Sequence, residues 1–159
     1  MTNAAWLSAI RRYMAVSLLG HAVWELVQLP LFTLWQEAPP RTVAFAALHC
    51  LGGDLAIAST VLVAALVLAG RHDWPGDGAA RVAALVLTFG SAYTGWSEYS
   101  NAIVKQTWTY TSAMPLVPWL GIGVTPLLQW VIIPALALRS TLTKSNRRIP
   151  HRSLPSGSG

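Results

Sequence analysis

Long runs of apolar residues, separated by short polar breaks, form the main pattern of this chain. Four such runs cover residues 13–35, 43–69, 80–104 and 116–138. Each run is long enough to cross a bilayer core of about 30 Å as an α-helix, at about 1.5 Å per residue. The breaks between the runs contain proline, glycine and charged residues, which end helices. We therefore expect an all-α fold within residues 1–142, namely a four-helix transmembrane bundle.

The composition of the chain agrees with a membrane location. Of its 159 residues, 53% are hydrophobic and only 11% are charged, whereas a soluble domain has about 25% charged residues. The four runs leave no stretch for a separate soluble domain. Residues 143–159 are basic and of low complexity, and we expect them to form a disordered C-terminal tail.

The positions of lysine and arginine predict the orientation of the helices. Of the 11 Lys and Arg residues, only Arg41 and Lys105 lie in the loops after the first and third runs. Because positive charge collects on the cytoplasmic side of a membrane, we expect both termini in the cytoplasm, in a bacterial inner (plasma) membrane. The positive residues that give the net charge of +5 then set the orientation of the protein in the membrane. The expected partner is therefore the lipid bilayer and not nucleic acid.

Ionisable side chains inside the apolar runs are the strongest indication of function. His21, Glu25, Asp54 and Glu98 lie within three of the runs. A charged side chain at the centre of a bilayer costs about 2.5–3.5 kcal/mol on insertion scales, needs a partner, and by default marks a functional site. We therefore expect these four residues to be catalytic groups in acid/base chemistry.

Helical spacing places further polar residues beside the ionisable ones. His21, Glu25 and Gln28 stand at i, i+4 and i+7 and share one face of the first helix. Counting inward at about 1.5 Å per residue places polar side chains from all four helices in one layer, in the middle and outer half of the membrane. We expect this layer to enclose a cavity whose ligand-binding residues are Gln28, His49, Tyr93, Thr94, Asn101, Gln129 and Trp130.

Three functions are compatible with such a cavity. In the first, a carboxylic acid beside a carboxylate or imidazole donates and accepts protons, so that the protein binds or isomerises a lipid-like amphipathic molecule without a cofactor. In the second, a set of histidine and carboxylate ligands binds Zn, Mn or Fe, or less readily haem, in an enzyme or transporter; the ligands would be His21, Glu25, His49 and Glu98. In the third, the chain is a proton-coupled carrier or a non-enzymatic subunit of a membrane complex. A homodimer also stays open.

Three short motifs contain many of these residues: HAVWE, from His21 to Glu25; GSAYTGWSEY in the third run; and QWVIIP, which begins at Gln129. They resemble the His-x-x-x-Glu, Gly-x-x-Tyr-Gly-Asp-x-x-Tyr and Asn-x-x-Trp-x-x-x-Pro segments of the EXPERA, or emopamil-binding-type, sterol isomerases, with Gln129 in place of asparagine. The resemblance implies an intramembrane isomerase. In it, His21 and Glu25 would manage protons while Gln129 and Trp130 face a cationic ligand.

Overall fold

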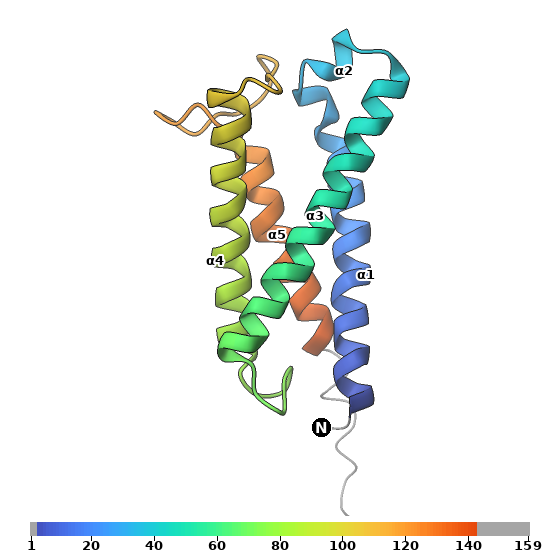
Figure 1. Ribbon diagram of the computed structural model, residues 1–159, viewed down its shortest axis with the longest axis vertical. Coiled ribbons are helices and arrows are strands. Elements are labelled where there is room, and N and C mark those ends of the chain that lie inside the picture. The colour runs from blue at the N-terminus through green and yellow to red at the C-terminus, as the bar shows by residue number, and fades with distance from the viewer. Residues whose placement is uncertain (1–2, 143–159) are drawn as a thin grey trace, which may run out of the picture.

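The structure, a computed structural model, describes residues 3–142 and is all helical apart from its connecting segments (Figure 1). The all-α prediction is therefore confirmed for this range. Four long helices lie side by side: α1 (Asn3–Gln28), α3 (Pro40–Ala69), α4 (Ala79–Glu98) and α5 (Val124–Leu142). The expected tail of residues 143–159 lies outside the described residues.

Shorter helices complete the connections. Between α1 and α3 lie the 3-10 helix η1 (Leu29–Leu31) and the single turn α2 (Leu34–Glu37), and the π-helix η2 (Tyr99–Val104) extends α4. The first helix starts well before residue 13 and ends before residue 35, in contrast to the prediction. It ends because Pro30 has no backbone N–H to continue the helical ladder, whereas proline at the first position of α3 suits a helix start.

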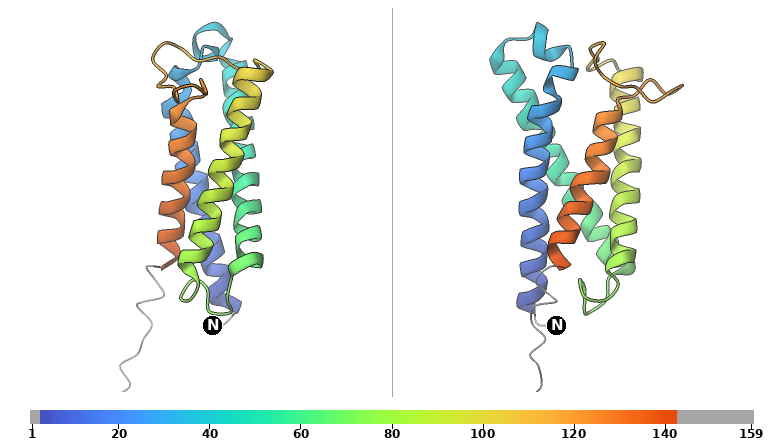
Figure 2. Two further views of the ribbon diagram at one scale, coloured as in Figure 1. Left: turned by 90° about the vertical axis from the view of Figure 1, so that its left-hand side faces the viewer. Right: turned by 180° about the vertical axis from the view of Figure 1, so that it is seen from behind.

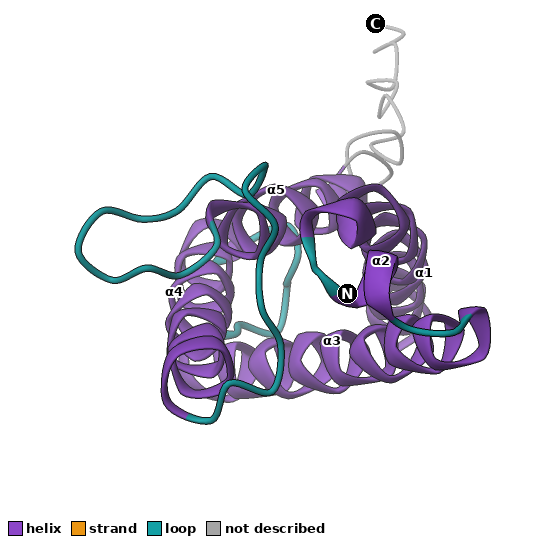
Figure 3. Cartoon of the chain, turned by 90° about the horizontal axis from the view of Figure 1, so that it is seen from above, coloured by secondary structure: helices purple, strands orange, loops and turns teal. Residues whose placement is uncertain are grey.

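The long helices follow one another around the molecule in the order α1, α3, α4, α5, and each packs against the next (Figure 3). The described chain begins and ends at the same end of the molecule, beside the loop of residues 70–78 (Figures 1 and 2). We call this the N-terminal end. The opposite end, here called the far end, contains residues 29–39 and 105–123.

Three helices among the described residues are long and apolar enough to cross a membrane: Ala5–Leu31, which is α1 with η1, then α3 and α5. Their length and composition indicate an integral membrane protein. The prediction of four spans is thus supported for three of them. α4 falls short of the others in apolar character because Arg81 lies near its start and polar residues, among them Thr94 and Glu98, lie near its end.

The fourth apolar run is helical over a shorter stretch than predicted. α5 begins at Val124 rather than near residue 116. Pro118 lacks a backbone N–H, and Gly121 adopts the left-handed conformation with φ +68°. The chain therefore reverses direction before the helix starts, and the backbone N–H of Val117 donates to the carbonyl of Ile122 over 2.8 Å.

Apolar packing fills the half of the molecule nearest the N-terminal end. Buried side chains from all four long helices and from the loop at this end meet there, among them Tyr13, Leu62, Trp74, Val86 and Ala137. α3 and α4 lie close together in this half and diverge toward the far end (Figure 1). The far half is where polar side chains face one another.

Candidate functional site

A pocket of about 740 Å³ lies in the far half of the molecule. All four long helices and both far-end connections contribute to its walls. Ten of the sequence-predicted site residues line it: Glu25, Gln28, His49, Asp54, Tyr93, Thr94, Glu98, Asn101, Gln129 and Trp130. The remaining predicted residue, His21, is fully buried beneath the pocket and contacts it through Gln129.

Gln129 of α5 joins polar side chains from three helices. Its amide nitrogen lies 2.9 Å from Nδ1 of His21, 3.2 Å from Oε1 of Glu25 and 3.0 Å from Oδ2 of Asp54. Its amide oxygen accepts a hydrogen bond of 3.2 Å from Gln28. We call these five residues, His21, Glu25, Gln28, Asp54 and Gln129, the acid cluster.

Further contacts tie the two carboxylates of the acid cluster to their surroundings. Gln28 donates a second hydrogen bond of 3.0 Å to Oε1 of Glu25. The indole N–H of Trp130 donates to Oδ1 of Asp54 over 3.2 Å, and Nδ1 of His21 lies 3.4 Å from Oδ2 of the same carboxylate. Both oxygens of Asp54 therefore have polar partners.

The acid cluster has fewer amide hydrogens than atoms that can accept them. An amide nitrogen carries two hydrogens, but that of Gln129 faces three acceptor atoms, one each on His21, Glu25 and Asp54. One of the three acceptors must therefore share a hydrogen or itself carry a proton. Carboxyl and imidazole groups that lie this close together are suited to acid/base chemistry.

Two glycines allow the close packing that forms the acid cluster. A methyl group at Gly20 of α1 would lie 2.8 Å from Cγ2 of Ile133, and one at Gly90 of α4 would overlap the ring of Trp130. The absence of a side chain at Gly20 brings α1 against α5, so that His21 reaches Gln129. The space at Gly90 seats the Trp130 ring where its N–H reaches Asp54.

Glu98 belongs to a separate polar group. Its side chain is 7% exposed, and it accepts a hydrogen bond from the hydroxyl of Tyr110. The indole nitrogen of Trp108 also lies close to this carboxylate, although outside the geometry of a direct hydrogen bond. No hydrogen bond or ion pair within residues 3–142 links Glu98 to the acid cluster, so the four predicted catalytic residues fall into two groups.

Tyr110 is a site residue that the sequence pattern did not indicate, because it lies between the third and fourth apolar runs. It reaches Glu98 because this segment folds back on residues 29–33. The backbone N–H of Thr33 donates to Thr109 over 3.0 Å, and that of Thr111 donates to Leu31 over 2.9 Å. Burial and the adjoining Glu98 carboxylate raise the pKa of the Tyr110 phenol above its ordinary value.

We expect Tyr110→Phe to lower the free energy of unfolding by about 1.5–3 kcal/mol, the usual contribution of a hydrogen bond to a charged group. The reason is that the buried Glu98 carboxylate loses its donor. Because the pKa of Tyr110 is raised in the folded state, its contribution is complete below about pH 10 and is lost at higher pH. Unfolding of the detergent-solubilised protein at pH 7 measures the first effect, and a second measurement at about pH 11 measures the loss at high pH.

The matched control is Tyr99→Phe, which removes the same hydroxyl from a side chain that is 44% exposed. We expect it to change the free energy of unfolding by less than about 0.5 kcal/mol, as is usual for surface substitutions. Equal effects of the two substitutions would contradict the role given to Tyr110.

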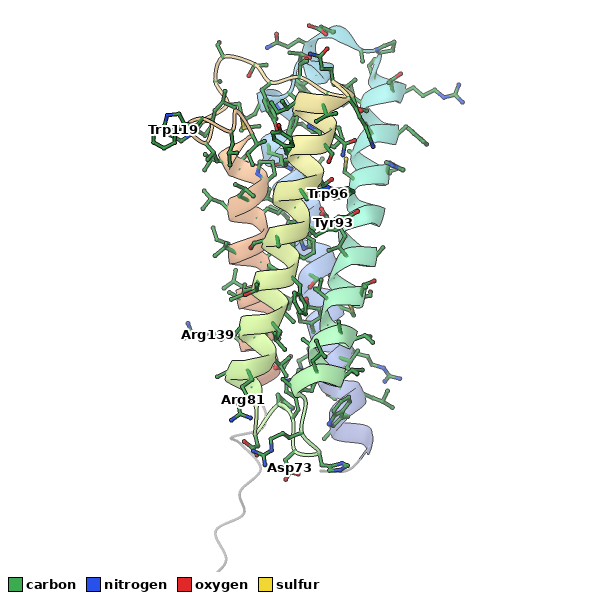
Figure 4. The ribbon with its side chains drawn as sticks, turned by 60° about the vertical axis from the view of Figure 1, so that its left-hand side comes forward. Asp73, Arg81, Tyr93, Trp96, Trp119 and Arg139 are labelled. Carbon is green, nitrogen blue, oxygen red and sulfur yellow. The ribbon has the colours of Figure 1, made fainter. Side chains whose placement is uncertain are left out.

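The remaining predicted ligand-binding residues line the pocket without joining the acid cluster. Tyr93 and Trp96 are exposed on α4, with ring centroids 5.6 Å apart, and lie beside α3 in Figure 4. Thr94 is buried. The side-chain amide of Asn101 donates to the backbone oxygen of Ser97 over 2.8 Å. Tyr93, Thr94 and Asn101 form part of the pocket wall on the α4 side.

The alternative set of metal ligands does not come together. His49 is exposed on α3 and stacks on the ring of Phe45 with a centroid distance of 6.0 Å, while Glu98 contacts Tyr110. Among the described residues, no group of three or more histidine, cysteine, aspartate or glutamate side chains is placed to hold a metal ion. The metal hypothesis for His21, Glu25, His49 and Glu98 therefore finds no support in the geometry.

Comparisons with protein-family models, with curated proteins and with solved structures found no match to this chain. The class of protein therefore follows from the structure alone. It is an all-helical protein with three helices fit to span a membrane and, between its helices, a pocket lined by acidic side chains.

Proposed function

We propose that this chain is a four-span membrane protein whose pocket binds a lipid-like amphipathic molecule with a basic or electron-poor head group. The acid cluster would supply and remove protons at that head group, as in an isomerase. The observation that carries this proposal is the contact of Gln129 with His21, Glu25 and Asp54 at one side of the pocket. Two helices, α1 and α3, bring costly ionisable groups to this one place, and α5 supplies the amide that joins them.

The membrane placement includes α4 as the fourth span. α4 packs between α3 and α5 and runs alongside them (Figure 3). Its polar residues Thr94 and Glu98 face the pocket instead of lipid, so they add little to the cost of insertion. Arg81 and Arg139 lie toward the N-terminal end and Trp119 at the far end (Figure 4). This distribution supports a cytoplasmic N-terminal end, and we infer a bacterial inner membrane as the location.

The size and charge of the pocket support the proposed ligand class. Its volume of about 740 Å³ falls within the usual range of about 300–1,000 Å³ for small-molecule sites. Four acidic residues line it, Glu25, Glu37, Asp54 and Glu98, and no described lysine or arginine does. A positively charged head group is therefore favoured over an anionic one.

The lipid bilayer is the proposed source of the ligand. α3 and α4 diverge toward the far end (Figure 1), and the pocket lies between their diverging halves. Phe45 of α3 is 69% exposed and Tyr93 of α4 is 45% exposed, and both line the pocket. An acyl chain in the membrane could contact these rings and slide between the helices, while the head group reaches Asp54. The resemblance to the EXPERA-type isomerases is a second line of support for an isomerase.

We expect Gly53→Leu to weaken binding of hexadecylamine at least about tenfold, which is about 1.4 kcal/mol. Gly53 lines the pocket directly beside Asp54, and a side chain there would enter open space that the ligand occupies. Tryptophan fluorescence titration of the detergent-purified protein measures the affinity. Native mass spectrometry reports whether lipid that co-purifies with the wild-type protein is lost from the variant.

Gly52→Leu is the matched control, because Gly52 is the neighbouring residue on α3, also has open space around it, and does not line the pocket. Both substitutions replace a helical glycine by leucine and should raise helix stability by up to about 1 kcal/mol. Gly52→Leu should leave hexadecylamine affinity unchanged within about twofold. If wild-type protein binds hexadecylamine no better than hexadecanoic acid, the proposed function fails.

A further inference from the structure

A row of buried polar side chains continues from the acid cluster toward the N-terminal end. Tyr13, Ser17 and His21 stand at intervals of four residues on α1, so they share one helix face. All three are fully buried, with no exposed side-chain surface. Glu25 is the next residue at the same interval, and the row therefore leads directly into the acid cluster.

The polar atoms of this row lack partners. Within the described residues, the Tyr13 hydroxyl, the Ser17 hydroxyl and Nε2 of His21 have no hydrogen-bond partner. The hydroxyls of Tyr13 and Ser17 lie close enough to interact, although outside the geometry of a direct hydrogen bond. A buried polar group without a partner costs about 1–3 kcal/mol. Three of them in succession on one face call for a functional explanation.

The surroundings of the row add polar groups at both of its ends. At the N-terminal end, the Arg12 guanidinium donates to the backbone oxygen of Ser140 over 3.5 Å. At the end of the row beside the acid cluster, Pro134 inside α5 has no N–H, so the carbonyl of Trp130 loses its helical donor. The Trp130 ring lies 5.1 Å from the ring of His21.

We propose that Tyr13, Ser17 and His21 form a proton path that connects the N-terminal end of the molecule with the acid cluster. Successive members lie about 6 Å apart along the helix axis. The hydroxyls of Tyr13 and Ser17 already lie close together, and between Ser17 and His21 two hydrogen bonds of about 2.8 Å through one water molecule bridge such a distance. Hydroxyl groups donate and accept at the same time, and chains of polar and ionisable groups are the usual proton relays inside membranes.

The transfer through His21 balances in protons. In the tautomer with hydrogen on Nδ1, Nε2 is a buried acceptor without a partner, one helical turn from Ser17. A proton that arrives at Nε2 gives an imidazolium, and the Nδ1 proton then passes to the Asp54 carboxylate 3.4 Å away. The products are a neutral imidazole with hydrogen on Nε2 and a protonated Asp54. In this product state Nδ1 accepts from the Gln129 amide, which is the contact of 2.9 Å in the structure.

The charged and titratable groups around His21 are consistent with delivery of protons to it. Glu25 lies on α1 and Asp54 on α3, and both contact Gln129 of α5 beside the imidazole. Glu98 on α4 is the next carboxylate, within electrostatic range of Asp54. The proton path rests on the proposed acid/base role of the acid cluster, because it would restore the proton that the cluster gives to a ligand.

The test is proton uptake into liposomes that contain the full-length protein and an internal pH dye, driven by a potassium gradient with valinomycin. We expect wild-type vesicles to take up protons at least about tenfold faster than protein-free vesicles, and Ser17→Ala and Tyr13→Phe each to remove most of this difference. Both substitutions delete a buried hydroxyl without a partner, so the unfolding temperature should stay equal or rise. A merely structural role would instead lower the unfolding temperature.

Ser59→Ala is the matched control, because its hydroxyl donates to the Leu55 carbonyl over 2.7 Å on α3, outside the row. Its proton uptake should equal that of the wild type. The path is overturned if vesicles with the wild-type protein take up protons no faster than protein-free vesicles. It is also overturned if the Ser17→Ala and Tyr13→Phe variants both take up protons as fast as the wild type. Hexadecylamine binding is measured separately from proton uptake. A negative result for proton uptake therefore does not contradict the proposed ligand site, and a negative result for hexadecylamine binding does not contradict the proton path.

Discussion

Replacing Glu25 by glutamine is expected to weaken hexadecylamine binding at least about tenfold, or about 1.4 kcal/mol, while the protein still folds. Glutamine has nearly the same shape, but it removes the negative charge and the exchangeable carboxyl proton. In the wild type, Oε1 of Glu25 receives hydrogen bonds from Gln28 and Gln129 at 3.0 and 3.2 Å. The amide oxygen of the variant can keep these bonds, so stability should change little. Any isomerase activity should fall further, because the cluster loses an acid/base group.

Glu37→Gln is the matched control for this prediction. Glu37 also lines the pocket, but it is exposed at the far end, where solvent and salt screen its charge. Its replacement should change hexadecylamine affinity by less than about twofold. Equal losses in both variants would mean that only the overall charge of the pocket matters. Unchanged binding in Glu25→Gln would remove the acid cluster from the proposed function.

The second large effect is expected for Gly90→Ala, which should lower the free energy of unfolding by about 1–2 kcal/mol. A methyl group at Gly90 would overlap the buried ring of Trp130, and such overpacking costs about 1–3 kcal/mol. The better helix propensity of alanine offsets part of this cost. Because Trp130 donates to Oδ1 of Asp54, a shift of the ring should also weaken hexadecylamine binding. Thermal unfolding in detergent and a binding titration measure the two effects.

Gly95→Ala provides the comparison on the same helix. A methyl group at Gly95 would meet Cδ2 of Leu127 at 3.8 Å, an ordinary van der Waals contact. This substitution should therefore raise the free energy of unfolding by about 0.5–1 kcal/mol through helix propensity alone. A stabilised Gly90→Ala variant would show that α4 moves away from Trp130 at little cost. Close packing of the Trp130 ring against Gly90 would then not position Asp54.

Helical periodicity was sufficient to place the residues of α1. His21, Glu25 and Gln28 share one face by their spacing, and the structure places all three against Gln129. The same spacing extends back through Ser17 to Tyr13. The sequence pattern alone does not single out this extension, because hydroxyl groups are common in apolar helices and cost less to bury than charged groups.

The grouping of the carboxylates could not be derived from spacing. Glu25 and Asp54 come together because α5 inserts Gln129 between α1 and α3, and the position of α5 depends on where helices pack. Glu98 stands apart because residues 105–123 fold back and bring Tyr110 onto it. Counting residues along a helix gives the depth of a side chain in a membrane, but it does not show which distant segment of the chain packs against that side chain.

The sequence by itself determined that the chain is helical, that long apolar stretches are fit to span a membrane, and that ionisable groups lie among them. These properties depend on local composition and on the period of the helix, and both can be read from residues that are close together in the chain. Only the tertiary structure decided which of these groups share hydrogen bonds, that Tyr110 partners Glu98, and that His49 and Glu98 lie apart from His21 and Glu25. Such contacts join residues far apart in the chain, and their geometry depends on how closely glycines such as Gly20 and Gly90 let the helices approach.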